Sequence, residues 1–147
     1  MMISTKGRYA LRVMVDLAEH QGAGYLPLKE IAARQEISEK YLETILKILV
    51  QQGMLTGVRG KGGGYRLAKT PADYSAGEIS RLAEGSLASV SCLKGEKKGC
   101  EKAGHCRALP LWQGLDQMID QYLDSYSLAD LQKQQAELDA AEAAEAP

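Results

Sequence analysis

The stretch from Leu28 to Leu67 constrains the fold most, because it holds two helical patterns and a hairpin pattern with no gap between them. Residues 28–34 have one apolar side, and the next three residues leave room only for a turn. Ser38 can then N-cap a second helix, which Gly53 can end as a C′ residue. The apolar residues of this second helix form one stripe: Leu42, Ile45, Leu46, Leu49 and Val50. Two helices joined by so tight a turn predict a helix-turn-helix, whose second helix enters the major groove of DNA.

A glycine-rich hairpin pattern follows the second helix directly. Residues 54–59 and 65–67 have strand character, and four glycines lie among the five residues between them. Arg59, Lys61 and Arg66 make this hairpin cationic. A packed helical hairpin followed by a flexible turn is the alternative interpretation, but helix, turn, helix and basic hairpin in this order is an uncommon combination. The sequence therefore predicts a mainly α, winged helix-turn-helix fold with a small β-hairpin wing.

The net charge of −1 hides a division between the two halves of the chain. Residues 1–70 carry eleven lysines and arginines against six acidic residues, a net charge of +5. Residues 71–147 carry seven against thirteen, a net charge of −6. The basic half contains the predicted helix-turn-helix, so attraction to phosphate should be local to one part of the molecule, as DNA binding requires.

The candidate DNA-contact residues fall in the first helix, in the exposed early turns of the recognition helix and in the wing. Thr5 is expected to cap the first helix, where basic side chains either contact phosphate or form a solvated basic turn. Glu43 can accept a hydrogen bond from cytosine N4, or can instead pair with Lys40 or Lys47 within its helix. The predicted DNA-contact residues are Thr5, Lys6, Tyr9, Ser38, Lys40, Tyr41, Glu43, Arg59 and Lys61.

A long amphipathic helix is predicted to begin at Pro110, outside the winged-helix core. Its apolar side is formed by Leu111, Leu115, Met118, Ile119 and Tyr122. A symmetric partner is the simplest cover for such a stripe, so we expect a homodimer that reads a pseudo-palindromic operator. We expect a DNA-binding domain over residues 1–85, a cysteine-containing sensor loop over 86–109, a dimerisation helix and a short following helix over 110–131, and a flexible tail over 132–147.

The three cysteines, Cys92, Cys100 and Cys106, all lie in the loop that precedes this helix. Five cations lie among or beside them, and nearby cations favour the thiolate, which is the form that binds metals. The spacing differs from the paired pattern of a zinc ribbon, and three thiolates are one ligand short of a four-ligand site. His105 is the nearest nitrogen ligand. The alternative is three unligated thiols, but their clustering favours a metal site.

Three motifs together resemble the Rrf-type winged-helix regulators: STKGRYALR at the N-terminus, ISEKYLE in the recognition helix and VRGKGGGYRL in the wing. The resemblance runs from about Met2 to Leu131, and the cysteine loop followed by ALPLW is similar to the cluster loop of IscR-type members, which CymR-type members lack. It implies a homodimer crossed by the long helix. It also implies a 2Fe–2S or 4Fe–4S cluster, of which we expect the former, held by the three cysteines and a fourth ligand.

The chain departs from the family pattern at the fourth ligand. The gap between the first two cysteines is two residues longer than in IscR-type members. The histidine of those members falls here on Leu109, and the aspartate of NsrR-type members falls on Arg8, neither of which can ligate. The fourth ligand stays open between His105, a carboxylate, a residue of the other subunit and a small exchangeable molecule.

Several functional classes follow from these patterns. The first is a cytoplasmic regulator that senses through a cluster and is expected to repress iron–sulfur or cysteine metabolism genes. The second is a regulator controlled by cysteine oxidation or by a sulfur-metabolism protein partner, and the third is a zinc-stabilised dimer that binds DNA constitutively. No apolar run approaches the roughly 20 residues of a membrane span. An enzyme is not expected, because no catalytic set stands out and the glycine run lacks the Lys-Ser/Thr of a phosphate-binding loop.

Overall fold

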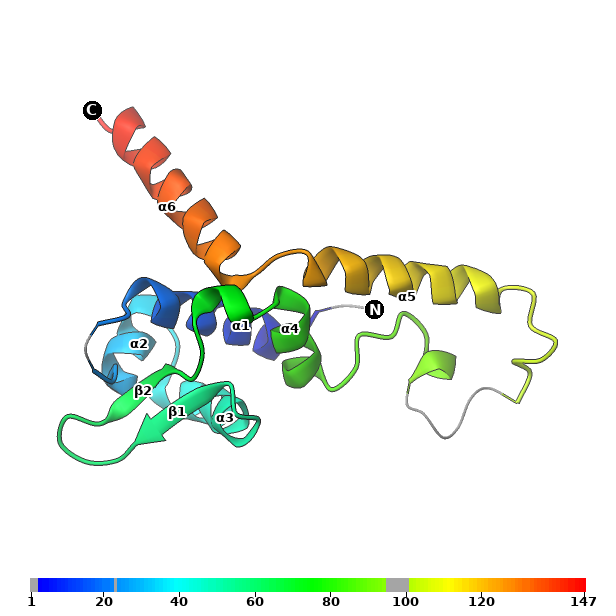
Figure 1. Cartoon of the computed structure of the whole chain (residues 1–147), viewed down its shortest axis with the longest axis horizontal. Coiled ribbons are helices and arrows are strands. Elements are labelled where there is room, and N and C mark those ends of the chain that lie inside the picture. The colour runs from blue at the N-terminus through cyan, green and yellow to red at the C-terminus, as the bar shows by residue number, and fades with distance from the viewer. Residues whose placement is uncertain (1–2, 23, 95–100) are drawn as a thin grey trace.

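The computed structural model describes residues 3–22, 24–94 and 101–147, which form a mainly helical fold with one small antiparallel sheet (Figure 1). Its elements, in chain order, are α1 (Thr5–Glu19), α2 (Leu28–Gln35), α3 (Glu39–Gln51), β1 (Leu55–Val58), β2 (Gly64–Leu67), a 3-10 turn η1 (Pro71–Asp73), α4 (Ala76–Glu84), a 3-10 turn η2 (Ser91–Leu93), α5 (Leu109–Asp124) and α6 (Leu128–Glu145). This order confirms the predicted fold class. None of the described helices combines the length and the apolar character that a membrane crossing requires.

An aliphatic core joins α1, α2, α3, α4 and the hairpin into one unit, residues 3–22 and 24–85, which we call the head, and Leu128 at the start of α6 is buried in the same core. The stripe predicted on the second helix is buried there, and Leu42, Ile45 and Leu46 are each at most 1% exposed. Tyr74 is buried in this core, and its hydroxyl is hydrogen-bonded. Its hydroxyl donates to the Met54 carbonyl at 2.7 Å and accepts from the Lys69 amide at 2.9 Å.

The turn between α2 and α3 is set by one residue in the left-handed region. Glu36 has φ of 54°, and its N–H bonds to carbonyls of the last turn of α2. Ser38 then caps α3 by accepting from the Tyr41 amide at 3.1 Å. The C-terminal end of α3 follows the prediction too, because Gly53 has φ of 74° directly after the C-cap residue. These local bonds satisfy helix-end groups within a very short connection.

The hairpin formed by β1, β2 and their connecting loop, residues 55–67, has the form of a wing. The strands pair from Leu55 opposite Leu67 to Val58 opposite Gly64. Tyr65 also exchanges two backbone hydrogen bonds of 2.8 Å with Leu26, which ties the wing to the segment before α2. Gly64 has a positive φ and lies so close to Leu26 that a β-carbon there would overlap the Leu26 carbonyl.

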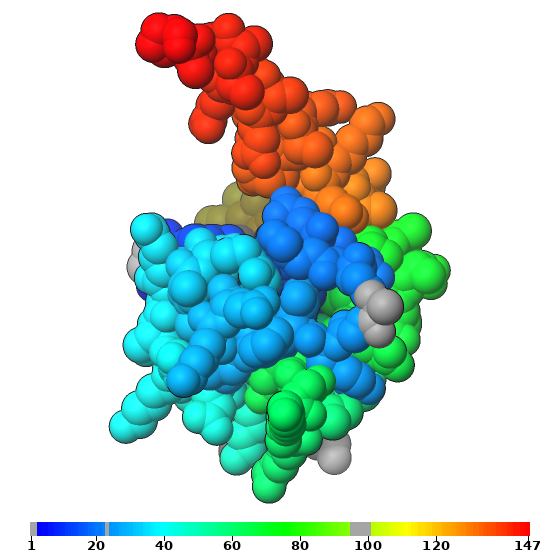
Figure 2. Space-filling view, turned by 90° about the vertical axis from the view of Figure 1, so that its left-hand side faces the viewer, coloured from blue at the N-terminus to red at the C-terminus, as the bar shows by residue number. Residues whose placement is uncertain are grey.

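The C-terminal arm, which consists of α5 and α6, extends from the head (Figure 1). Helix α5 begins at Leu109, one residue before the predicted start at Pro110. The helix after residue 127 continues to Glu145, beyond the short helix expected there. Helix α6 begins with a capping box between Ser127 and Asp130, and its far end projects away from the head, on the side opposite the wing (Figure 2). The flexibility of residues 132–147 stays a prediction.

Candidate nucleic-acid interface

The exposed face of α3 carries the polar residues predicted to contact DNA. Ser38, Lys40 and Glu43 are exposed, whereas Tyr41 is half-buried because it packs against the core. Two further exposed residues on this helix, Thr44 and Lys47, were not among the predicted contacts. Their spacing could have indicated this position, because residues four and three apart, such as Lys40, Thr44 and Lys47, lie on the same face of a helix.

A groove of about 500 Å³ lies between α3 and the wing. It is lined by Glu43 and Lys47 from the recognition helix and by Arg59, the residue that follows β1. The sequence shows only that the recognition helix and the wing follow one another in the chain. The fold places residues of both motifs around one groove. Lys61 is also exposed, but it lies outside the lining of this groove, in the loop of the wing.

The first helix reaches the recognition helix through an aromatic contact. The rings of Tyr9 and Tyr41 meet edge to face with their centroids 6.0 Å apart, and the Arg12 guanidinium lies 4.8 Å above the Tyr9 ring. Edge-to-face pairs of this kind add to the stability that burial provides. Tyr9 thus supports the position of Tyr41.

The N-terminal turn of α1 differs from the prediction in its cap. Ser4, and not Thr5, is the N-cap residue, and its hydroxyl accepts from the Gly7 amide at 3.2 Å. The Thr5 hydroxyl is exposed and accepts from Arg8 at 3.1 Å. Ser and Thr are both favoured N-cap residues, so the sequence does not show which of these two neighbours caps the helix. Lys6 is half-buried and lines a small hollow between α1, α3 and α4.

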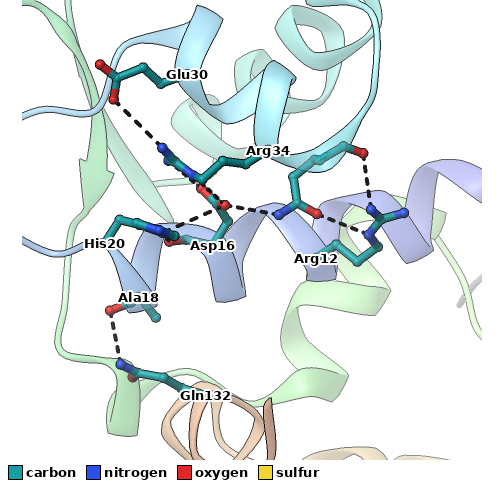
Figure 3. A network of polar contacts seen from close by, with 8 residues as sticks. Arg12, Asp16, Ala18, His20, Glu30, Arg34 and Gln132 are labelled. Carbon is teal, nitrogen blue, oxygen red and sulfur yellow. Dashed lines mark hydrogen bonds and ion pairs between the residues drawn. The ribbon is translucent and has the colours of Figure 1, made fainter. Parts of the chain in front are cut away.

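A buried carboxylate, which the sequence did not single out, locks α1 onto α2 (Figure 3). Asp16 is 2% exposed and accepts from Arg34 at 2.9 and 2.8 Å and from Gln35 at 3.0 Å. Arg12 in turn donates to the side chain and to the backbone carbonyl of Gln35, both at 3.1 Å. The hydrogen bonds that Arg34 donates to Asp16 raise the pKa of Arg34, because they favour the charged guanidinium. This network fixes the helix that precedes the recognition helix.

The described cysteines lie on either side of residues 95–100, which include Cys100 and fall outside the described ranges. Cys92 is half-buried in η2, and Cys106 is half-buried three residues before α5, where its carbonyl accepts from the Leu109 amide at 3.3 Å. His105 is exposed. Among the described residues, no group of three His, Cys, Asp or Glu residues converges on a metal site. The donor chemistry of partly buried thiols still fits an iron–sulfur cluster, whose usual ligands are thiolates.

Helix α5 exposes an apolar stripe and fixes its opposite side to the head. The exposed residues are Leu111 (66%), Leu115 (40%), Met118 (69%) and Tyr122 (63%). On the other side, Arg81 of α4 donates to Asp120 at 3.1 Å and to Asp124 at 2.7 Å. Asp116 accepts from the Ser89 amide at 2.8 Å, which ties the segment before the cysteines to α5. The hydrogen bond from Arg81 lowers the pKa of Asp124.

Comparison with known proteins agrees with this architecture. The family model described as "Rrf2: Iron-dependent Transcriptional regulator" matches residues 3–134. The HTH-type transcriptional regulator IscR of Aliivibrio salmonicida is 37% identical over 131 residues, which cover 89% of this chain and 77% of that protein. The IscR of Xenorhabdus nematophila is 37% identical over 142 residues, which cover 97% of this chain and 85% of that protein.

Two solved structures show the same fold. The structure of CymR, the global cysteine regulator of B. subtilis, is 38% identical and covers 90% of this chain and 97% of its own, with a TM-score of 0.73. IscR of T. potens is 35% identical and covers 100% of this chain and 93% of its own, with a TM-score of 0.69. These relatives are transcriptional regulators, which confirms both the resemblance and the expectation that the chain is not an enzyme. The chain therefore belongs to the Rrf2 family of transcriptional regulators.

Proposed function

We propose that the chain binds double-stranded DNA as a homodimer, with α3 in the major groove and the wing along the adjacent backbone or minor groove. The observation that carries this proposal is the groove shared by Glu43, Lys47 and Arg59, which combines a base-reading acceptor with two cations. The positive charge of the N-terminal half supports it, since that half contains both elements. The proposed contacts are Thr5, Lys6, Tyr9, Ser38, Lys40, Tyr41, Glu43, Arg59 and Lys61.

The homodimer is proposed from the exposed side of α5. Four large apolar side chains lie along one face of a helix whose other face is already attached to the head. A second copy of the same helix would cover them, and a two-fold dimer would present two recognition helices to a pseudo-palindromic operator.

Control of DNA binding is proposed to lie in the cysteine segment. Cys92, Cys100 and Cys106 would hold an iron–sulfur cluster, expected as 2Fe–2S, with the fourth ligand open among the candidates named above. Such a cluster supplies a redox-active, oxygen-sensitive group when bound. The segment is well placed for control, because Ser89 on one side of it and Cys106 on the other both contact the first half of the arm. A regulator of this kind in the cytoplasm would act, as a repressor, on genes of iron–sulfur cluster or cysteine metabolism.

Anaerobic purification is the experiment that tests cluster control. A brown protein with visible absorption, iron and sulfide supports it, and replacing any one of the three cysteines with alanine should then abolish or sharply reduce iron uptake. The loaded and cluster-free forms should differ in affinity or site choice on a duplex that the chain selects from a random-sequence library, since a ligand acts only through its differential affinity for two states. A chain that takes up no iron, or identical binding by both forms, contradicts the proposal.

The DNA interface is tested separately by two matched substitutions in the groove. Glu43→Ala should change sequence preference more than overall affinity, because a carboxylate repels phosphate but can accept from cytosine. Arg59→Ala should weaken binding to every duplex and reduce the salt slope by about one counterion per lost phosphate contact. Equal effects of Glu43→Ala on selected and scrambled duplexes, or an unchanged salt slope for Arg59→Ala, would remove the residue concerned from the interface.

A regulator without a cluster is the alternative, and the similarity to the B. subtilis CymR structure favours it as the second candidate. Its signal would be cysteine oxidation or a sulfur-metabolism protein partner. A colourless, metal-free protein whose DNA binding changes with thiol oxidation or with an added partner would support this alternative. Zinc in the purified protein would instead indicate a structural metal.

A further inference from the structure

The N-terminal turn of α1 is anchored by a carboxylate from the end of α4. The backbone N–H and the hydroxyl of Ser4 both donate to one carboxylate oxygen of Glu84, each at 2.8 Å. The same hydroxyl accepts from the Gly7 amide, so one side chain joins the cap of α1 to the last residue of α4. These contacts link residues that are 80 positions apart in the chain.

Glu84 also supplies a charge that α1 lacks. A helix N-terminus carries partial positive charge and is stabilised by acidic side chains in its first turn. The first turn of α1 contains no acidic residue of its own. The Glu84 carboxylate, which belongs to another helix, provides this negative charge at the N-terminus of α1.

A glycine in α1 makes room for this carboxylate. Gly7 is buried, and a β-carbon at that position would overlap the end of the Glu84 side chain. Glycine weakens a helix interior relative to alanine, so its presence needs a local reason. The close approach of Glu84 supplies one.

Helix α4 contacts α5 through a second carboxylate with a glycine beside it. Arg81, in the last turn of α4, binds Asp120 and Asp124 of α5. A β-carbon on Gly77 would overlap the Asp124 carboxylate, as one on Gly7 would overlap that of Glu84. Helix α4 therefore connects α5 to the first turn of α1 through two carboxylate contacts, each with a glycine beside it.

We propose that Glu84 is a positioning residue for DNA binding, which sets the N-terminal turn of α1, with Thr5 and Lys6, relative to the recognition helix and to the arm. The inference rests on the proposed DNA-binding function. Glu84 need not touch DNA itself. It acts through Ser4, and through α4 it makes the placement of that turn depend on how α5 is held.

The test compares Glu84→Ala with Glu84→Gln on two duplexes, one that the wild-type chain selects from a random-sequence library and a scrambled version. Glu84→Ala should lower affinity for the selected duplex by about tenfold, the size expected for a lost hydrogen bond to a charged group. Affinity for the scrambled duplex should fall less than that for the selected duplex, because losing a negative charge favours attraction to phosphate and offsets part of the lost positioning. Glu84→Gln should stay within about twofold of wild type on the selected duplex, since its amide oxygen can still accept from Ser4. Glu137→Ala, on the exposed part of α6, is the matched control for charge and should change neither affinity.

Gly7→Ala displaces the Glu84 side chain without changing any charge, so it separates position from electrostatics. It should lower affinity for the selected duplex by about as much as Glu84→Ala does. The double variant should bind like Glu84→Ala alone, because the added methyl group then has nothing to displace. Circular dichroism melting checks that each variant folds. Should Glu84→Ala fail to fold, Gly7→Ala and Glu84→Gln still decide the matter.

A wild-type chain that selects no duplex would overturn the proposed function and, with it, this inference. A wild-type chain that selects a duplex, while Glu84→Ala and Gly7→Ala keep its preference for that duplex over the scrambled one, would overturn this inference alone. Loss of preference in Glu84→Gln as severe as in Glu84→Ala would also overturn it, because charge rather than position would then be responsible.

Discussion

Helix α3 buries its apolar stripe in the core of its own chain, whereas helix α5 leaves its stripe exposed. The two helices have similar lengths of 13 and 16 residues, and both carry large apolar side chains at helical spacing. Four residues of α3 are buried, including Leu42 and Leu46, and none of α5 is buried. Met118 at 69% and Leu111 at 66% exposure show how far α5 is from being covered.

The difference shows that an amphipathic pattern predicts an apolar helix face that needs to be covered. Which surface covers that face depends on the topology of the fold. Helix α3 follows a short turn after α2, so the chain itself packs α1, α2 and α4 around it. Helix α5 follows the head in the chain, and its Asp120 and Asp124 bind Arg81 of α4 while most of its apolar stripe stays exposed. Its stripe is therefore left exposed, and the proposed homodimer would cover it.

The largest effect should come from a cavity in the head. Leu46→Ala should lower the free energy of unfolding by about 2–5 kcal/mol, because a fully buried leucine loses both its transfer energy and its packing. Urea denaturation followed by circular dichroism measures this change. A loss below about 1 kcal/mol would show that the core of the head can collapse around the gap.

The matched substitution in the arm should leave the head folded and separate the protomers. Met118→Lys should raise the dimer dissociation constant by about a hundredfold, as charges at the centre of an apolar interface do. Sedimentation equilibrium measures it, with Gln117→Lys as the control, since Gln117 is exposed on α5 but lies off the stripe. An unchanged dimer dissociation constant for Met118→Lys would show that the interface lies elsewhere and that the stripe of α5 is not covered by a second copy.

The sequence predicts those parts of the head that depend on short-range patterns. The stripe of α3, the cap at Ser38 and the glycine-rich wing all follow from spacing and residue type, and the structure contains each of them. Asp16 and Glu84 could not be predicted, because their partners lie 18 and 80 positions away and only packing brings them together. Helix α6 extends beyond the short helix expected there, because its alanines and glutamates favour helix strongly even without a continuous apolar stripe.

The candidate site divides in the same way. The residues of α3 and the wing lie where the motifs predict, but the groove that joins Glu43 to Arg59 needed the fold to bring the two motifs together. The DNA contacts and the cysteine ligands stay predictions, and Cys100 lies outside the described ranges. The spacing of three cysteines identifies possible ligands but does not fix where their sulfur atoms meet.

An intermediate effect is expected from a polar contact inside the head. Tyr74→Phe keeps the buried ring but removes the hydroxyl that serves the Met54 carbonyl and the Lys69 amide. Leaving these groups without their partner should cost about 1–3 kcal/mol of unfolding free energy. Burial raises the pKa of Tyr74, so the neutral hydroxyl is the form present at pH 7. Urea denaturation should show the loss, and Tyr25→Phe, on a half-buried ring beside Arg66, should cost less.

The smallest effect should come from the contact between head and arm, where Asp124 pairs with Arg81 at 2.7 Å. Both side chains are more than a third exposed, at 44% and 39%, so solvent screens the pair and its contribution should be at most about 1 kcal/mol. The bond from Arg81 lowers the folded-state pKa of Asp124 below its ordinary value of 3.8. The contribution is therefore complete above that value and is lost as the pH falls through the lowered pKa.

Asp124→Asn should accordingly be slightly less stable than wild type at pH 7, and the difference should shrink as the pH falls below about 4. Urea denaturation at a series of pH values measures it, with Asp139→Asn on the exposed part of α6 as the control. A difference that grows toward acid would reverse the sign and exclude the pair as its source. A difference well above 1 kcal/mol at neutral pH would mean that α5 is held to the head more firmly than its exposed aspartates suggest, which would weaken the contrast between the buried α3 and the exposed α5.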